Sequence, residues 1–195
     1  DFDRNGTIEQ IISVPNTRGT YPLVLRHDLV KQIPSLKKKY LKYESYKEQS
    51  VTDIFDEAQL ENAVIWQAEE LRSTIFINEG NMRFTMKALP KEVQFAPVKS
   101  ILIEDIDNDG NKDLVIGGNF SKAKPETGIY AASYGNFLKG DGKGNFDVVP
   151  ARESGLICKG EVRDFVLLEI NGKKRLYVLK NNEALQVYDI NNQNL

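Results

Sequence analysis

The chain has 195 residues, of which 41% are hydrophobic, and its 26 basic and 28 acidic residues give a formal net charge of −2. This length suits one domain with a sizeable core, and the near-neutral charge gives no reason to expect a nucleic acid or an anionic membrane as a partner. No apolar run approaches the roughly 20 residues of a membrane-spanning helix, so we expect no membrane span.

The chain opens on an acidic stretch, DFDRNGTIE (1–9), that returns in its middle as DIDNDGNKD (105–113). The two stretches match at five positions: Asp1 with Asp105, Asp3 with Asp107, Asn5 with Asp109, Gly6 with Gly110, and Glu9 with Asp113. Repetition of this kind predicts a repeat architecture. Four aspartates crowd into the second copy, and because like charges repel, we expect a hard cation to compensate them.

Residues 26–72 differ from the rest of the chain, because they are rich in Lys, Glu, Gln, Leu and Tyr and poor in glycine. Asp28 is a predicted cap of a first helix, and Thr52 and Asp56 are predicted N-caps of further helices. We interpret the segment as a helical insertion between the second and third strands of a first β unit.

Short β-type segments separated by glycine turns make up most of the remaining sequence. FINEGNMRF (76–84) lines up with LKGDGKGNF (138–146), and each predicts a turn between two strands. A degraded third copy, VRDFVLLEINGKKRLYVLKNN (162–182), has Asn171 and Gly172 in the favoured positions of a hairpin turn. The acidic loop is missing from this copy, so we expect it to have lost the ion.

The predicted fold class is therefore mainly β, as a partial β-propeller of about three four-stranded blades. We expect one propeller segment over residues 1–195: blade 1 at about 1–90 with the insertion at 26–72, blade 2 at about 96–150, and blade 3 at about 160–190. Because propellers commonly need about four to eight blades, we expect the C-terminal part of a larger propeller. Missing blades or a second copy of the chain would then cover its open faces.

The spacing of the acidic residues predicts ligands for calcium, which takes about six to eight oxygen atoms. The predicted ligands of the stronger site are the side chains of Asp105, Asp107, Asp109 and Asp113 and the backbone carbonyl of Asn111. Those of a second, weaker site are Asp1, Asp3, Asn5, the carbonyl of Thr7, and Glu9. An EF-hand is excluded, because its twelfth position would be Ile116 and the flanking segments are β-type. Magnesium, and polar turns without any metal, remain alternatives.

The loops DIDNDGNKDLVIGGN and DFDRNGTIE, together with FLKGDGKGNF and FINEGNMRF, resemble the FG-GAP/VCBS repeats of integrin α-chain propellers and of cartilage acidic protein-like and ASPIC/UnbV-associated proteins. The resemblance covers nearly the whole chain and is greatest to large secreted or surface VCBS-repeat proteins of Bacteroidetes-type bacteria. It implies a calcium-stabilised propeller with an extracellular, cell-surface or periplasmic location. Glu9 departs from the aspartate usual in the family, and the third repeat lacks the loop.

Two classes of function follow from this reading. The first is a non-catalytic module for recognition of or adhesion to a protein or glycan, with Tyr130 and Tyr134 of the loop at 119–135 as candidate contact residues. The second is the scaffold of a calcium-dependent polysaccharide-acting enzyme, for which Glu153 or Asp164 would supply acid/base chemistry. A structural spacer is a third alternative. The lack of a nucleophile motif favours the non-catalytic module.

Cysteine and histidine, two of the chemically reactive residue types, each occur once in the sequence. Cys158 is the only cysteine, so it makes no intrachain disulfide, and we expect it to be a small buried hydrophobic residue. His27 is the only histidine, which leaves at most one imidazole for a zinc site or a catalytic triad. We expect it to be a solvated or capping residue beside Asp28.

Overall fold

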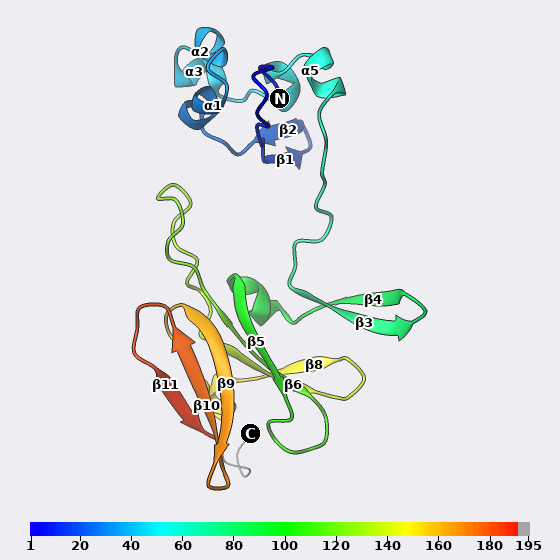
Figure 1. Cartoon of the computed structure of the whole chain (residues 1–195), viewed down its shortest axis with the longest axis vertical. Coiled ribbons are helices and arrows are strands. Elements are labelled where there is room, and N and C mark those ends of the chain that lie inside the picture. Colours follow the sequence, from blue (N-terminus) through cyan, green and yellow to red (C-terminus); the bar gives the residue numbers. More distant parts are fainter. Residues whose placement is uncertain (191–195) are drawn as a thin grey trace. The chain divides into compact units, whose positions relative to one another are not determined.

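The computed structural model describes residues 1–190, which are mainly β and contain several small antiparallel sheets (Figure 1). The chain divides into two compact units, Asp1–Glu69 and Glu70–Leu195. None of the helices within the described residues has the length and apolar character that a membrane crossing requires.

The first unit consists of one β-hairpin and five short helices. The hairpin is formed by β1 (Ser13–Asn16) and β2 (Gly19–Pro22), and the helices are α1 (Arg26–Gln32), α2 (Leu36–Lys39), α3 (Tyr43–Tyr46), α4 (Val51–Ile54) and α5 (Glu57–Glu61). This confirms helices in the predicted insertion, although none of them extends beyond Glu61. The helices enclose their own core, in which Leu29, Tyr40 and Phe55 are buried.

The helix caps differ in part from the prediction. Asp56 caps α5 as expected, because its carboxylate accepts a hydrogen bond from the backbone N–H of Gln59. The N-cap of α4 is Ser50 and not Thr52, and Ser50 forms a reciprocal capping box with Asp53. Asp28 lies in the first turn of α1 instead of capping it, where its negative charge still suits the helix dipole.

The described residues of the second unit, 70–190, form three sheets. A hairpin is formed by β3 (Thr74–Gly80) and β4 (Arg83–Ala88), followed by the 3-10 helix η1 (Lys91–Phe95). A four-stranded antiparallel sheet has the order β5 (Val98–Glu104), β6 (Asp113–Gly118), β7 (Asn136–Gly140), β8 (Phe146–Val149). After α6 (Ala151–Ser154), a three-stranded sheet has the order β11 (Gln186–Asp189), β10 (Lys173–Lys180), β9 (Val162–Ile170).

The predicted blades agree with these sheets to different extents. The region of blade 2 is a four-stranded up-and-down sheet, and the region of blade 3 is a three-stranded one whose turn at Asn171 and Gly172 has the predicted left-handed backbone. In the region of blade 1, the strands form two separate hairpins that belong to different units. The inserted helices have a core of their own, against which the ring of Phe2 stacks on Phe55 at a centroid distance of 4.1 Å. The described residues form no closed propeller.

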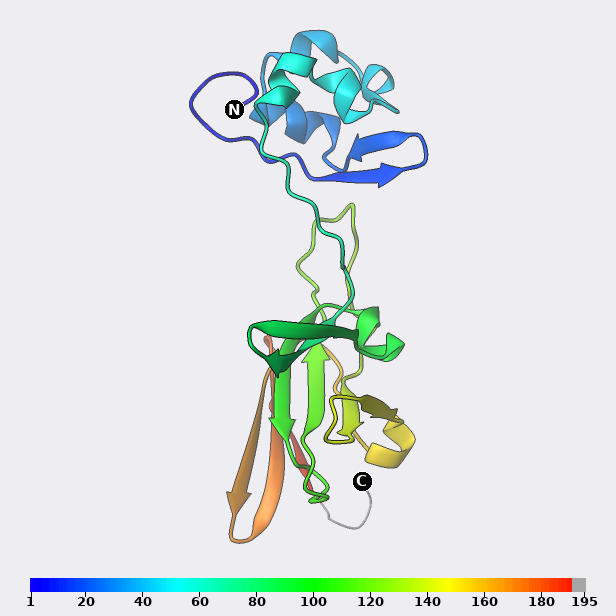
Figure 2. The ribbon, with the colours of Figure 1, turned by 90° about the vertical axis from the view of Figure 1, so that its right-hand side faces the viewer.

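Strand β6 lies at the centre of the second unit, and all of its residues are buried. Val115 on one face joins the core shared with β9 and β10, whereas Leu114 and Ile116 on the other face pack with Leu138. This burial on both faces explains the continuous apolar run of the sequence. Strand β9 packs against β5 and β6 (Figure 2). At Gly117 a Cβ atom would lie 2.7 Å from the Phe165 ring, so the glycine permits this close packing.

Candidate metal centre

The second acidic loop, residues 105–113, connects β5 to β6 and turns back on itself through hydrogen bonds from its own backbone. The two carboxylate oxygens of Asp105 accept from the N–H groups of Asp109 (3.1 Å) and Gly110 (3.0 Å). Asp107 also accepts from Asp109 N, and Asp109 accepts from Asn111 N at 2.8 Å. As a result, Asp105, Asp107 and Asp109 each place one carboxylate oxygen within 4.8 Å of the others.

The first acidic loop, residues 1–9, has the same internal structure. Five hydrogen bonds within the first loop have counterparts within the second. Three are accepted by the first two aspartates: Asn5 N to Asp1 Oδ1 corresponds to Asp109 N to Asp105 Oδ1, Asn5 N to Asp3 corresponds to Asp109 N to Asp107, and Gly6 N to Asp1 corresponds to Gly110 N to Asp105. In the other two, Thr7 N to Asn5 corresponds to Asn111 N to Asp109, and Phe2 N to Glu9 corresponds to Ile106 N to Asp113. The glycine of each loop has a positive φ, 88° at Gly6 and 90° at Gly110. The match found in the sequence is therefore also a match in conformation.

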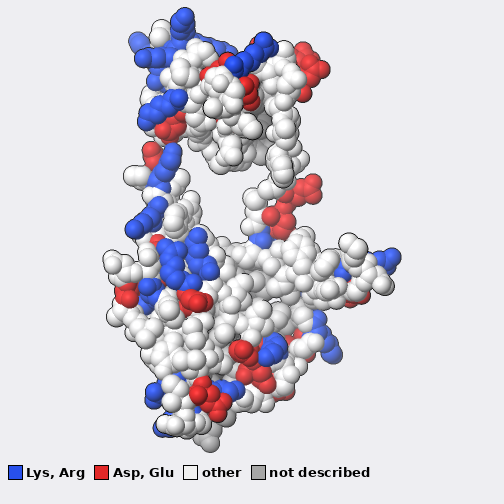
Figure 3. Space-filling view, viewed as in Figure 1, with Lys and Arg blue, Asp and Glu red and all other residues white. Residues whose placement is uncertain are grey.

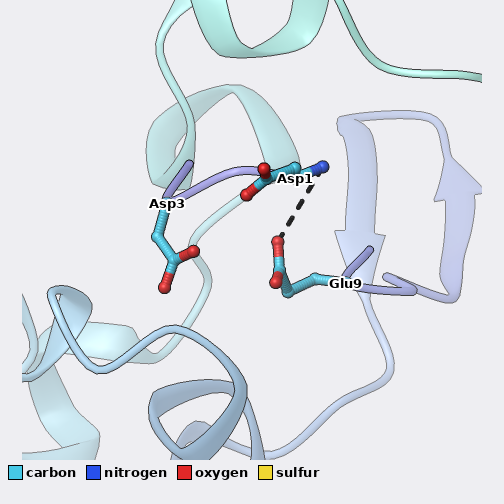
Figure 4. A group of neighbouring side chains, drawn as sticks. All are labelled: Asp1, Asp3 and Glu9. Carbon is cyan, nitrogen blue, oxygen red and sulfur yellow. Dashed lines mark ion pairs between the residues drawn. The ribbon is translucent and has the colours of Figure 1, made fainter. Parts of the chain in front are cut away.

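The last acidic residue behaves differently in the two loops. Asp113 is fully buried, and its two oxygens accept from the N–H groups of Ile106 and Gly140, each at 3.0 Å. It lies outside the group formed by the other three aspartates. In the first acidic loop the longer Glu9 side chain does belong to the group, with Asp1 and Asp3. Figure 4 shows its carboxylate pointing toward Asp1, whose amino group lies 4.0 Å from Glu9 Oε2.

The structure therefore brings together three of the predicted ligands in each loop. Asn5 is held by its own turn, because its side-chain oxygen accepts from the N–H and the hydroxyl group of Thr7. The Asn111 side chain lies against the β7–β8 turn, where its Oδ1 would be 2.4 Å from a Cβ atom on Gly142. The roles of the Thr7 and Asn111 carbonyls stay predictions.

Lys139 on β7 is the residue at this site that the sequence did not reveal. Its ammonium group pairs with Asp107 and lies 3.0 Å from Asp109 Oδ2. Hydrogen bonds from Asn111 and then from Lys139 lower the pKa of Asp109, and the two aspartates raise the pKa of Lys139. The contact joins residues 32 positions apart, so it depends on how β6 and β7 pair and leaves no local motif in the sequence.

The other candidate residues have structural contacts. Asp164 accepts from the hydroxyl group of Ser100 at 3.2 Å, and the exposed Glu153 pairs with Arg152. Cys158 is buried as predicted, and burial raises its pKa to about 11, which makes it an inert thiol.

His27 takes part in two contacts with neighbouring side chains. Its Nδ1 lies 2.6 Å from the Tyr43 hydroxyl, and its Nε2 lies 3.3 Å from Asp28.

Over the helices of the first unit, basic side chains gather on the face drawn in Figure 3.

Each acidic group places three carboxylate oxygens within 4.8 Å of one another, which is close enough for them to share one metal ion. Hard divalent cations prefer oxygen ligands of this kind. Comparison of the chain with protein-family models, curated proteins and solved structures gives no match, so the interpretation depends on the residues themselves.

Proposed function

We propose that the chain is a non-catalytic, calcium-binding β-propeller module of a secreted or cell-surface protein that recognises a protein or glycan. The observation that carries this proposal is the pair of acidic loops. Each loop contains the same five internal hydrogen bonds, although the two loops belong to different compact units. One such turn is common on protein surfaces. Two copies of the turn, each with three carboxylates close together, favour the same role for both copies. Calcium prefers carboxylate oxygens of this kind as ligands.

The propeller part of the proposal is supported by the way the sheets of the second unit pack. The strands follow one another in order from β5 to β8, and the next sheet begins with β9 against β5 and β6. Neighbouring propeller blades have this relation between their first strands. Asn119 strengthens the junction, because its side-chain amide donates to the carbonyls of Ser133 and Gly160, each at 2.8 Å.

Recognition is assigned to the loop at residues 119–135, between β6 and β7. The hydrogen bonds of Asn119 fix the base of this loop, while Tyr130 and Tyr134 are 44% and 55% exposed. Exposed tyrosine rings offer flat apolar contact area and a hydroxyl group to a glycan or protein. Calcium-binding modules outside the cell work at about 10⁻⁴–10⁻³ M, which suits a loop with only three converging carboxylates.

Calcium titration by calorimetry on the full chain tests the metal site. We expect two ions per chain, with loss of one in Asp109→Asn and of the other in Asp3→Asn. Asp141→Asn is the matched control, because Asp141 is an exposed aspartate whose carboxylate accepts hydrogen bonds from Lys143 and Asn145 of its own turn. At free calcium about 100 times Kd, each occupied site stabilises its unit by about 2.7 kcal/mol.

Absence of calcium binding at millimolar concentration, or equal loss in the Asp141→Asn control, would refute the metal site. A glycan array, run with calcium and with chelator, tests the recognition role. Retention of a glycan without turnover is expected, and cleavage would instead favour a catalytic scaffold.

A further inference from the structure

The second acidic loop differs from the first in its contact with the neighbouring strand. Lys139 extends from β7 and pairs with Asp107 and Asp109, two of the three acids that converge. The Asp107 side chain is only 8% exposed and that of Lys139 is 46% exposed, so the pair is partly shielded from water. An ammonium group in this place offsets the repulsion between carboxylates that would otherwise oppose folding of the loop.

The corresponding outside contact of the first acidic loop is neutral. There the Gln59 side chain donates to the Phe2 carbonyl at 2.8 Å, and the Phe2 ring stacks on Phe55. These contacts hold the loop in place, but they bring no positive charge from a neighbouring element. Positive charge comes from within the loop, where the Asp1 amino group lies 4.0 Å from Glu9 Oε2. The two loops thus have the same internal geometry and different charge compensation.

We propose that Lys139 is a built-in counter-cation of the second acidic loop, which keeps the loop folded without a metal ion and competes with calcium for Asp107 and Asp109. The competition rests on the calcium binding proposed above, whereas the stabilising role does not. A cation that binds these two carboxylates must displace the ammonium group or share the oxygens with it. The second loop therefore binds calcium more weakly than its carboxylates alone would allow.

Replacement of Lys139 by methionine tests the proposal on the full chain. Methionine keeps much of the apolar stem and removes the charge. In chelator we expect the second unit of Lys139→Met to melt about 3–5 °C lower than that of wild type, because the variant loses roughly one favourable ion-pair interaction. In calorimetry we expect its calcium affinity at this loop to be roughly two- to fivefold higher. Lys143→Met is the control, because Lys143 is an exposed lysine of the adjacent β7–β8 turn.

The possible results separate this proposal from the calcium site itself. Equal melting temperatures in chelator and equal calcium affinities for wild type and Lys139→Met would overturn it. A lower melting temperature without calcium binding by any variant would support the counter-cation role and refute the calcium site. Calcium binding by Lys139→Met that wild type lacks would support the competition directly, and the same change in Lys143→Met would refute it.

Discussion

Replacement of Asp113 by alanine is expected to remove a large share of the stability of the second unit. The buried carboxylate accepts one hydrogen bond from Ile106 at the start of the second acidic loop and one from Gly140 at the end of β7. Alanine leaves both N–H groups without this acceptor. Each buried unsatisfied donor costs about 1–3 kcal/mol, so the expected loss is about 2–6 kcal/mol, against about 5–15 kcal/mol for a typical domain.

A matched control separates burial from the number of hydrogen bonds. Asp141 also accepts from two backbone N–H groups, those of Lys143 at 2.7 Å and Asn145 at 3.0 Å, but it lies in an exposed turn. Water replaces its carboxylate, so Asp141→Ala should lose much less stability. Denaturant unfolding followed by circular dichroism in chelator measures both losses, provided that the m values agree. Equal losses in the two variants would refute the reasoning.

The same measurement in calcium decides whether Asp113 is also a metal ligand. If Asp113 only ties the loop to β7, Asp113→Ala should lose as much stability in chelator as in saturating calcium. If it also binds the ion, the loss in calcium grows by the binding free energy that the variant no longer gains.

Two further predictions concern the second unit. The Glu161 carboxylate accepts from Ser121, Asn181 and Arg163, and these bonds, that of Ser121 first, lower its pKa from 4.5 to about 2. The stabilisation by the ionised Glu161 carboxylate is therefore complete above pH 4.5 and is lost as the pH falls toward about 2. Unfolding free energies measured across this pH range should fall more steeply with decreasing pH in wild type than in Glu161→Gln. Parallel curves for the two proteins would contradict this prediction. At Gly118 a Cβ atom would lie 1.8 Å from the Pro97 carbonyl oxygen. Gly118→Ala should cost about 1–3 kcal/mol or more, and an unchanged denaturation midpoint would contradict it.

The parts of the structure that the sequence predicted well are those fixed by near neighbours. The acidic loops depend on bonds between residues at most five positions apart, such as Gly110 N to Asp105, apart from the closing bond of the last acid. The hairpin turn at Asn171 and Gly172 needs only two residues with positive φ, 54° and 72°. The capping box of Asp56 with Gln59 spans three positions. Local chemistry decides each of these features, so one sequence is sufficient to find them.

The features that the sequence did not predict depend on distant parts of the chain. In the predicted first blade, the hairpin β1–β2 would have to pair with the hairpin β3–β4 across the inserted helices. That pairing would compete with burial of residues in the helical core, and the two hairpins remain in separate sheets. The contact of Lys139 with the second acidic loop follows from the pairing of Leu114 with Leu138 on β6 and β7, which no periodicity reveals. The buried role of Asp113 has the same origin, because its partner Gly140 is 27 positions away.

These long-range contacts have opposite effects on a cation at the second acidic loop. The hydrogen bonds that Asp113 accepts from the N–H groups of Ile106 and Gly140 fix both ends of the loop before any ion arrives, which reduces the ordering cost of binding. Lys139 acts against binding, because its charge already satisfies two of the carboxylates. The balance predicts a second unit that folds without metal and responds modestly to calcium. The first acidic loop has the counterpart of the Ile106 bond, from Phe2 N to Glu9, but among the described residues it has no charge from a neighbouring strand like that of Lys139. Its unit should therefore depend on the ion more strongly, which reverses the order of the two sites expected from the sequence.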